Sequence, residues 1–375
     1  MKIAYIANAR IPTEKAHGAQ IMNTCAALIE AGAEVELIIP RRDSKASFDP
    51  FRPYGLEDTF KISRLFSIDL LRSGLYKPLA FALQTITFSI SSLLSLKGRD
   101  VIIYGRDESV LALLSLFHDR IFWESHTGND NIFTRILLKR AQGVVCISHG
   151  LADLYLQKGL DKSKVLVAAD AVDMAAFDVI TEGSADLRQF LGLPVDRSIV
   201  TYSGSIGLYT WKGVDVFLDS VPLVRDLRVN FLIIGGSDGE IAKLKQERPD
   251  ERIIFIGRMS HDKIPRYLKA SDVLVIPNKA GSLVSEKYTS PMKLFEYMAS
   301  RKVIVASDLP SIREVIDDAD AIFFRPNDAR DLAQKIEGAI SDSLMSQRKA
   351  DGAYEKARRY TWRGRASNIL DFIRR

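Results

Sequence analysis

The sequence has 375 residues, of which 47% are hydrophobic and 26% are charged, with a formal net charge of +5 at pH 7. This length suits two domains rather than one core, and the composition excludes a disordered chain. The pI near 9.0 is mild and the basic residues are spread along the chain, so we do not expect nucleic acid as a partner. An acidic small ligand or an anionic membrane surface accounts for the charge equally well.

The first ten residues, MKIAYIANAR, predict a short β-strand and a loop, without the long apolar core of a signal peptide. Cys25 and Cys146 fall in an expected helix and an expected strand, far apart and without metal-ligand spacing. We therefore expect buried reduced cysteines, no bound metal and a cytoplasmic location.

Short apolar runs alternate with helical patterns through the first half of the chain. The helical pattern at 17–32 ends at Gly32, as helices often do. Continuous apolar runs are typical of a parallel sheet covered on both faces. The predicted strands are 2–8, 34–40, 100–106, 121–126, 143–148 and 164–170.

The run 78–96 carries no charge and is long enough to be tested as a membrane span. It contains Gln84, Thr85, Thr87 and several serines, and it lies between segments of α/β pattern. We expect a largely buried or interfacial helix that does not span, and peripheral contact with the inner membrane surface stays an open alternative.

The alternation pauses at 181–194, which we interpret as a linker with one short helix, and then restarts. The second set of predicted strands is 198–205, 229–236, 252–257, 271–278, 302–307 and 321–326. The final helix, 361–375, carries Trp362 and Phe372 and is too apolar for a solvated tail. The sequence predicts two doubly wound, Rossmann-like parallel-sheet domains, at 1–180 and 195–360.

Residues 271–310 predict a strand, a loop, a helix and a second strand. Ser290 is a good N-cap and Pro291 suits the first helical turn, whose free amides make an anion site. Lys293 adds a positive charge in that turn, and Glu296 could bind a hydroxyl attached to the anion. Together they would hold a nucleotide; the alternative is an ordinary capped helix.

This segment, with its SPMKLFEYMA sequence, resembles the donor-site helix of retaining glycosyltransferases of family 4 in their SPxKxFEYMA variant. The resemblance implies the GT-B architecture, in which a cleft separates two Rossmann-like domains and the last helix returns to the N-terminal one. It also implies a nucleotide diphosphate sugar as donor, with no permanent cofactor and no metal. Glu296 matches the second Glu of the family's E-x7-E motif, and this Glu binds the ribose of the donor. At the position of the first Glu this chain has Tyr288, and Glu286 lies two residues before that position.

Glycines and cations at successive strand ends extend the expected donor site. Lys212-Gly213 matches the family's KG pair, but Ser205 replaces the arginine expected beside Gly204, so phosphate charge would rest on Lys212 and Lys293. In the family, a loop like the one at Gly257-Arg258 holds the base through backbone contacts. The expected donor-binding residues are Gly18, Gly204, Ser205, Lys212, Gly213, Gly257, Arg258, Ser290, Pro291, Met292, Lys293 and Glu296.

In the first domain, His126 ends a strand and precedes Thr127-Gly128, so it would stand in the cleft. Its Glu124-Ser125-His126 context resembles the same variant, in which this histidine contacts the donor sugar. The alternative for His126 is a purely structural side chain; His261, in a polar connection, is less attractive. We expect catalytic roles for His126, Lys212, Lys293 and Glu296, and acceptor or sugar contacts from Arg106, Glu124, Glu286 and Tyr288.

The triplet Asp318-Ala319-Asp320 has the form DxD, which binds metal and diphosphate in the other large glycosyltransferase fold. It precedes a strand outside the expected cleft, and we interpret it as a solvated turn.

The leading interpretation is a retaining, metal-independent glycosyltransferase that moves a sugar from a UDP- or GDP-sugar to a glycan, lipid-linked or small-molecule acceptor. A GT-B-like epimerase acting on the nucleotide sugar is an alternative, and would need cleft carboxylates such as Glu124 and Glu286. A non-catalytic sugar-nucleotide-binding protein is a third. The base, sugar and acceptor cannot be read from the sequence.

Overall fold

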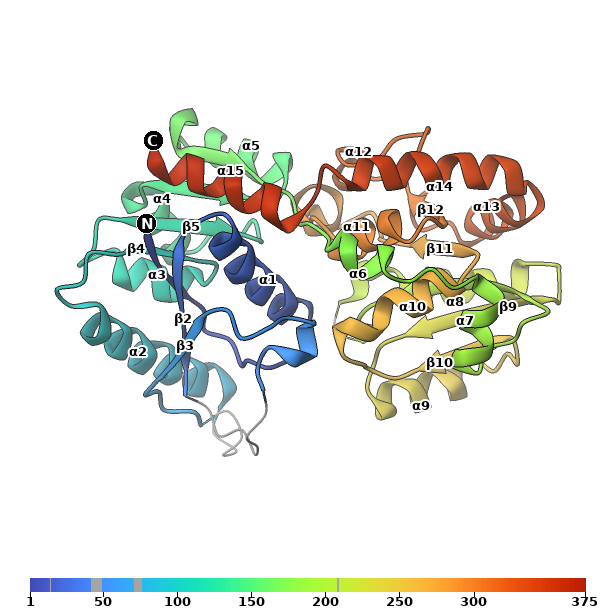
Figure 1. The fold of residues 1–375 in the computed structure, drawn as a ribbon, viewed down its shortest axis with the longest axis horizontal. Helices are drawn as coiled ribbons and strands as arrows, with labels where there is room; N and C mark the ends of the chain where they lie inside the picture. The colour runs from blue at the N-terminus through green and yellow to red at the C-terminus, as the bar shows by residue number, and fades with distance from the viewer. Residues whose placement is uncertain (14, 42–48, 71–75, 208) are drawn as a thin grey trace. The chain divides into compact units, whose positions relative to one another are not determined.

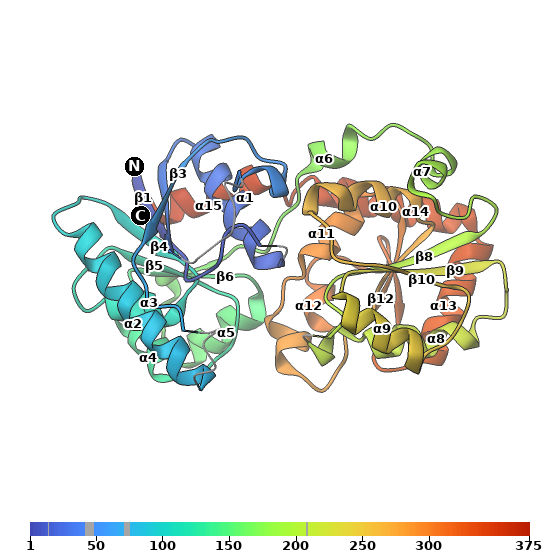
Figure 2. The same ribbon diagram turned by 90° about the horizontal axis from the view of Figure 1, so that it is seen from below.

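The computed structural model describes residues 1–13, 15–41, 49–70, 76–207 and 209–375. They form two compact units: unit 1 comprises Met1–Ala169 and Trp362–Arg375, and unit 2 comprises Asp170–Thr361. Figures 1 and 2 show the same ribbon from two directions, with a parallel sheet flanked by helices in each unit. Each unit is described by itself below.

The described part of unit 1 forms a seven-stranded sheet in the order β3-β2-β1-β4-β5-β6-β7, with every neighbouring pair parallel. Its strands are β1 (Lys2–Ile6), β2 (Glu34–Pro40), β3 (Lys61–Leu65), β4 (Ile102–Gly105), β5 (Ile121–Ser125), β6 (Gly143–Cys146) and β7 (Val165–Val167). Its helices are α1 (Ala16–Glu30), α2 (Lys77–Leu96), α3 (Glu108–Leu114), α4 (Ile132–Arg140), α5 (His149–Gln157) and α15 (Trp362–Arg374), with short 3-10 turns at Arg52–Tyr54 and Lys162–Lys164.

Unit 2 forms a six-stranded parallel sheet over its described residues, in the order β10-β9-β8-β11-β12-β13. Its strands are β8 (Ser198–Ser203), β9 (Val229–Ile234), β10 (Ile253–Ile256), β11 (Val273–Ile276), β12 (Val303–Ser307) and β13 (Ile322–Phe324). Its helices are α6 (Met174–Asp178), α7 (Ser184–Leu191), α8 (Val214–Ser220), α9 (Asp238–Glu247), α10 (Ile264–Ala270), α11 (Met292–Ala299), α12 (Pro310–Arg313), α13 (Ala329–Ser341) and α14 (Ser343–Ala357). Short 3-10 turns lie at Thr210–Lys212, Val221–Leu223 and His261–Lys263, and a π-helical turn lies at Val284–Tyr288.

The two sheets share one strand order, and the order reverses between β1 and β4 in unit 1 and between β8 and β11 in unit 2. Ligands of doubly wound folds bind beyond the carboxyl ends of the strands at such reversals. The predicted class, two Rossmann-like parallel-sheet domains, is confirmed. The topology therefore points to the loops after β1 and β4, and after β8 and β11.

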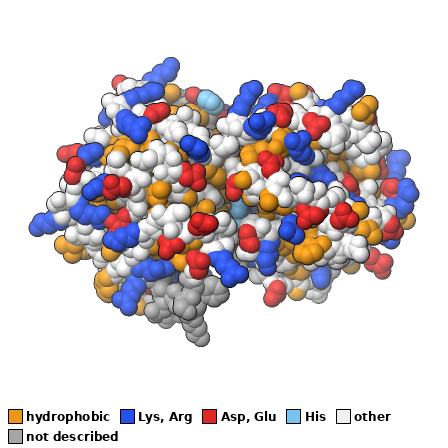
Figure 3. All heavy atoms as spheres, viewed as in Figure 1, with side chains coloured by type: hydrophobic (Ala, Val, Ile, Leu, Met, Phe, Trp, Pro, Cys, Tyr) orange, Lys and Arg blue, Asp and Glu red, His pale blue; other side chains and the backbone are white. Residues whose placement is uncertain are grey.

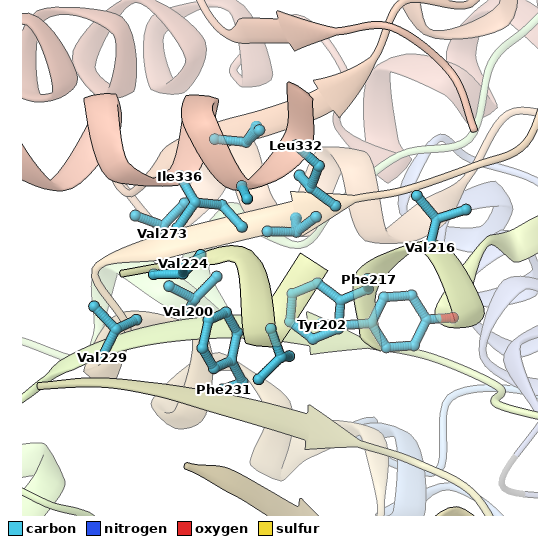
Figure 4. Close-up of a cluster of buried hydrophobic side chains, with 14 of the residues drawn as sticks. Val200, Tyr202, Val216, Phe217, Val224, Val229, Phe231, Val273, Leu332 and Ile336 are labelled. Atoms are coloured by element: carbon cyan, nitrogen blue, oxygen red, sulfur yellow. The ribbon is translucent and has the colours of Figure 1, made fainter. Parts of the chain in front are cut away.

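The core of unit 2 lies between its sheet and the helices α8 and α13. Figure 4 shows Val200, Phe217 and Phe231 packed together, with Leu332 and Ile336 of α13 closing the cluster. All five side chains are buried. This packing holds β8 and α8 rigidly, so the loop that joins them projects from a fixed base.

The C-terminal helix α15 is part of unit 1, where it packs against α1. Phe372 lies edge-on to Phe122 of β5, with ring centroids 5.9 Å apart. A side chain at Gly143 would meet that ring, since a Cβ there would lie 2.6 Å from Phe372. The apolar face noted in the sequence is therefore a packing face.

The domain boundaries differ from the predicted ones. Residues 170–180 belong to unit 2 rather than to the first domain, because Val172 forms a parallel bridge with Thr361. The predicted linker 181–194 also lies within unit 2: Leu187 and Leu193 are buried in a cluster with Ile180 and Ile199. The composition of 181–194 signals a turn-rich segment, but its few apolar side chains suffice to dock it.

The helix predicted at 78–96 is α2, and by length and composition it could cross a membrane. It is not largely buried, because only 39% of its most apolar window lies inside the structure. Pro78 falls in the first turn, where its missing N–H costs no hydrogen bond. α2 lies at the outside of unit 1 in both ribbon views.

Candidate functional sites

The carboxyl edge of the unit 2 sheet gathers most residues of the expected donor site. Gly204 follows β8, and the loop after β11 leads through the π-helical turn to α11. The turn Thr210–Lys212 is tied to the loop after β11, because Lys279 N donates to Trp211 O at 2.8 Å. The loops on both sides of the strand reversal are thus linked to each other.

Lys293 is a buried cation at this edge. Its Nζ is buried and has no hydrogen-bond partner among the described residues. It lies 4.1 Å from the centre of the Tyr202 ring, a weak compensation for a buried ammonium. Burial, followed by the charge of Lys212, lowers the pKa of Lys293 well below its usual range. A bound anion would offset both the burial of the Lys293 ammonium and its repulsion by Lys212.

Lys212 is the second cation of this site. Its Nζ lies 5.1 Å from the ring centre of Tyr209 and 5.8 Å from that of Trp211. Burial lowers the pKa of Lys212 to about 8. Among the described residues neither lysine is paired with a carboxylate, although the charge of Glu296 partly opposes the lowering of the Lys293 pKa, and a bound anion would stabilise both cations.

Glycine is required at two positions of this edge. Gly213 has φ +69°, and a Cβ there would lie 1.7 Å from Pro277 O. Gly204 has φ +146°, and a Cβ there would lie 3.5 Å from Lys293 Nζ. The first glycine lets two loops approach closely, and the second adopts a backbone conformation beside the ammonium that other residues rarely adopt.

Glu296 lies on α11 and is buried, with its Oε1 2.6 Å from His261 Nε2. Burial lowers the pKa of His261, but the carboxylate of Glu296 outweighs this effect and the net shift is upward. The pair therefore favours a protonated imidazole. A sugar hydroxyl that binds Glu296 would meet a carboxylate whose other oxygen is already oriented by His261.

The start of α11 differs from the sequence prediction. The helix begins at Met292, and Pro291 occupies the N-cap position without a side-chain cap. Ser290 is therefore not the N-cap; its Oγ accepts a hydrogen bond from Asp170 N at 2.9 Å. The serine fixes the strand-to-helix loop instead. Leu294 N donates to Pro291 O at 2.8 Å, so the amides of Met292 and Lys293 are the ones in the first turn of α11 that no carbonyl of this helix can accept from.

The remaining donor-site candidates have ordinary surroundings. Ser205 O accepts from the Tyr202 hydroxyl at 2.9 Å. Arg258 pairs with Glu240 at 3.1 Å, so its guanidinium is already engaged. Gly257 has no positive φ and open space at its Cβ, and its backbone conformation does not demand glycine.

Glu286 and Tyr288 belong to the π-helical turn before α11. Glu286 Oε1 accepts from Gly281 N at 2.6 Å, so this carboxylate closes its own loop. Tyr288 is half-buried. π-Helical turns are uncommon and occur frequently at functional sites, which makes this loop a fitting place for sugar contacts.

In unit 1, Glu124 is the centre of a buried polar network. Its carboxylate accepts from Gln20 Nε2 at 2.5 Å and from the Tyr104 hydroxyl, and it pairs with Arg365 at 3.1 Å. Burial alone would raise the pKa of Glu124, but Arg365 and hydrogen bonds from His126 and Tyr104 hold it well below its usual range. Glu124 is thus an ionised anchor and not a proton donor at neutral pH.

His126 follows β5, and its Nε2 lies 2.6 Å from Glu124 Oε1. Burial and the charge of Arg106 lower the pKa of His126 to about 4, so the ring is neutral near pH 7. Because a carboxylate can only accept, Nε2 carries the proton and Nδ1 keeps a lone pair. Nδ1 can therefore accept a hydrogen bond from a sugar hydroxyl.

Arg106 extends the same network, since its Nη1 donates to Gln20 Oε1 at 2.9 Å. With Asn8 and His17 it lines a cavity of about 220 Å³ at the strand reversal of unit 1. Gly18 opens α1 beside it, and a Cβ at this position would lie 2.5 Å from Thr13 Cγ2 and 2.7 Å from the Tyr54 hydroxyl. The cavity is a place for a polar ligand next to a fixed guanidinium.

Sequence reasoning missed three partners of these sites. His261 was set aside as part of a polar connection, although its place in a loop after β10 was a usable signal. Tyr104 lies inside a strand, and Arg365 lies in the C-terminal helix, far from Glu124 in sequence. Neither Tyr104 nor Arg365 lies in a sequence pattern that indicates a contact with Glu124.

The DxD triplet is only half solvated. Asp318 is exposed and pairs with Arg313 at 2.7 Å, whereas Asp320 is buried and pairs with Lys356. The prediction of a solvated turn is therefore wrong for Asp320, which helps to fasten α14. Among the residues that the structure describes, no three His, Cys, Asp or Glu side chains are grouped so that they could hold a metal ion.

Comparison with known proteins gives the context of these sites. Residues 197–342 match the family model described as glycosyl transferases group 1. This segment is similar to the members of that family. It contains the Lys212, Lys293 and Glu296 positions, and hence the whole unsatisfied cationic site.

Curated relatives match part of the chain. A putative colanic acid biosynthesis glycosyl transferase, WcaI of Escherichia coli (strain K12), is 28% identical over 153 residues, 40% of this chain and 37% of that protein. A phosphatidyl-myo-inositol mannosyltransferase of Mycobacterium leprae (strain TN) is 29% identical over 162 residues, 42% of each chain. The chain thus spans less than half the length of these relatives.

The fold matches over nearly its whole length. The crystal structure of Anabaena Alr3699/HepE in complex with UDP-glucose superposes with a TM-score of 0.76, covering 99% of this chain and 98% of that one at 17% identity. At this identity the likeness establishes the fold alone, which is that of the GT-B glycosyltransferases.

Proposed function

We propose that the chain is a glycosyltransferase that takes a sugar from a nucleotide diphosphate sugar. The observation that carries the proposal is the buried, unpartnered Nζ of Lys293, close to a second lysine, Lys212, at the strand reversal of the family-matched domain. A diphosphate is the ligand whose charge, size and hydrogen-bonding capacity fit two ammonium groups and the first amides of α11.

In this proposal the bond from the anomeric carbon to the diphosphate oxygen breaks, and its electron pair leaves with the diphosphate. Lys212 and Lys293 stabilise the growing negative charge. The acceptor hydroxyl oxygen bonds to the anomeric carbon, and its proton passes to the departing diphosphate. Following the family resemblance, attack occurs from the leaving-group face, with retention and without a protein nucleophile.

Glu296, oriented by His261, would bind the ribose. We assign no metal to the reaction, because the two lysines and the helix amides together supply the charge that a divalent ion supplies elsewhere. Turnover is accordingly expected to persist in excess EDTA.

The donor is proposed to be a UDP- or GDP-sugar, and the acceptor a glycan, a lipid-linked sugar or a small molecule. The relatives named for colanic acid and phosphatidyl-myo-inositol support saccharide or lipid acceptors. The cavity beside Arg106 and Asn8 in unit 1 is a candidate acceptor contact. Two buried free cysteines, Cys25 and Cys146, agree with a cytoplasmic location.

An epimerase is less well supported by the contacts. Its two candidate carboxylates are both engaged, Glu124 by Arg365 and Tyr104, and Glu286 by the amide of Gly281. Neither is placed to exchange a proton with a substrate carbon.

A thermal-shift screen of UDP, GDP, ADP and their sugars, each with and without EDTA, tests the proposal. A nucleotide at about 100 times its Kd stabilises the fold by about 2.7 kcal/mol, enough for a clear shift of Tm. We expect one base to stabilise the protein equally with and without EDTA. If none of these nucleotides stabilises it, the donor site is refuted; stabilisation that EDTA abolishes refutes its metal independence.

A further inference from the structure

The outer face of α2 is apolar where a surface helix should be polar. The stripe consists of Leu79, Ile86, Ile90 and Leu94, which are 51%, 49%, 52% and 70% exposed. Leu83 continues the stripe and is half-buried. These positions follow one another at spacings of three or four residues, so they share one side of the helix.

The inner face of α2 is unusually polar. Gln84 Nε2 donates to Asn8 Oδ1 at 2.6 Å, and Asn8 Nδ2 donates to Thr85 Oγ1 at 3.2 Å. Ser89 and Ser92 are also buried on this side. Phe88 and Leu96 are buried on this side as well, so the helix combines a mixed inner face with an outer face of large apolar side chains, where a usual surface helix is polar. These inner hydrogen bonds hold α2 on the sheet, so it can lie on a membrane but not cross it.

The loop after β3 enlarges the apolar surface. Ile68 N donates to Thr87 Oγ1 of α2 at 3.0 Å, which places this loop beside the helix. Ile68 and Phe66 are 37% and 66% exposed, and Tyr76, just before α2, is 74% exposed. Exposed apolar groups gathered in one place mark an interaction surface rather than chance exposure.

Charge decides which partner fits this surface. α2 contains no acidic residue, and Lys77 and Lys97 stand exposed at its two ends without an acidic partner among the described residues. Unit 1 as a whole has 25 Lys and Arg against 18 Asp and Glu, a net charge of +7 within a chain of net +5. On the face shown in Figure 3, basic and acidic side chains are interspersed.

We propose that α2, with Phe66, Ile68 and Tyr76, docks unit 1 on an anionic membrane surface. The apolar stripe enters the boundary between headgroups and acyl chains, and Lys77 and Lys97 contact anionic headgroups. A second copy of the chain fits less well, because a symmetric contact through α2 would bring two units of net +7 together. The inference does not depend on the proposed glycosyl transfer.

Flotation of the full chain with phosphatidylcholine vesicles, with and without phosphatidylglycerol, tests the proposal. We expect binding to the anionic vesicles that weakens as NaCl is raised. Ile86→Gln/Ile90→Gln should lower the partition coefficient about 10-fold or more, since two side chains leave the lipid contact. The matched control is Leu227→Gln/Leu344→Gln in unit 2, whose side chains are 72% and 63% exposed; it should bind like the parent protein.

Circular dichroism and nucleotide affinity should be the same in all three proteins, because the substituted side chains are exposed and none of them belongs to the cationic site. Absence of vesicle binding, or an equal loss in the control, would overturn the proposal. So would a dimer, seen by light scattering, that the α2 substitutions dissociate while vesicle binding is unchanged. If the protein binds vesicles as expected but binds no nucleotide, the membrane proposal stands and the donor site is refuted.

Discussion

At the scale of single residues, both sites depend on ionisable groups whose burial sets their charge. Glu124 stays ionised because Arg365 and three hydrogen-bond donors surround it, and this carboxylate orients a neutral His126. Lys293 and Lys212 form no ion pair with a carboxylate in the part of the chain that the structure describes. In unit 1 the buried carboxylate is thus paired with a cation, whereas in unit 2 the buried ammonium of Lys293 awaits an anion that a ligand would supply.

His126→Ala tests the role of the neutral imidazole. We expect the variant to fold, to bind nucleotide diphosphate almost as tightly, and to lose about 10²-fold in turnover, the scale for one positioned catalytic group. The reason is that Nδ1 would bind a sugar hydroxyl more strongly as charge develops at the anomeric carbon. Steady-state kinetics of transfer, beside calorimetry of nucleotide binding, separate the two effects. Near-normal turnover would leave His126 with a structural role only.

The lowered pKa of Lys212 predicts a pH dependence of nucleotide binding. With a pKa of about 8 in the free protein, the ammonium is partly deprotonated at pH 8. A bound diphosphate favours the charged form and raises that pKa, so binding takes up a proton. Affinity should be highest below pH 8 and should fall as pH rises above it. Calorimetry at pH 8 in buffers of different ionisation enthalpy measures the uptake; zero uptake contradicts the assignment.

At the scale of elements, the loop before α8 is positioned by its close approach to the loop after β11. Gly213→Ala should destabilise the protein by at least about 2 kcal/mol and weaken nucleotide binding, because its Cβ would overlap Pro277 O. Gly192→Ala is the matched control: its φ is +68°, but no atom lies within 4 Å of the added Cβ. It should lose only about 1 kcal/mol. Equal losses in urea denaturation would show that loop approach is unimportant.

The C-terminal helix contributes a charge as well as an apolar face to unit 1. Arg365→Met should lower the free energy of unfolding by about 3–5 kcal/mol, since it leaves Glu124 buried without its cation. Arg363→Met, on the same helix but exposed, should change it by less than about 0.5 kcal/mol. Chemical denaturation compares the two. A small effect of Arg365→Met would mean that Tyr104, Gln20 and His126 suffice to hold the carboxylate.

At the scale of the whole molecule, the two Rossmann-like sheets could be predicted because their signals are local. Each strand is a short apolar run, and turn residues mark its ends. The cationic site was partly predictable for the same reason, since Lys212-Gly213 and the segment around Lys293 carry recognisable patterns.

Pairings between distant segments could not be predicted. Arg365 reaches Glu124 only because α15 packs on α1, and His261 reaches Glu296 only because the loop after β10 folds over α11. The short helix expected within 181–194 is α7, but the segment is not a free linker, because two buried leucines, Leu187 and Leu193, outweigh its turn-rich composition. Whether such a segment docks on a domain depends on the burial of a few side chains. Burial depends on the tertiary structure and cannot be predicted from local sequence patterns.

The central claim is that Lys293 and its surroundings form a site for the diphosphate of a nucleotide. Calorimetric titration of the parent protein, Lys293→Met and Lys302→Met with UDP, GDP and ADP tests it most directly. Lys302 is a matched lysine of unit 2 whose Nζ already donates to Ser184 Oγ at 2.7 Å. The account predicts that Lys293→Met weakens binding of the preferred nucleotide by about 1.5–3 kcal/mol, or about 10- to 150-fold, and that Lys302→Met leaves it unchanged. Equal affinity in Lys293→Met and the parent protein would contradict it.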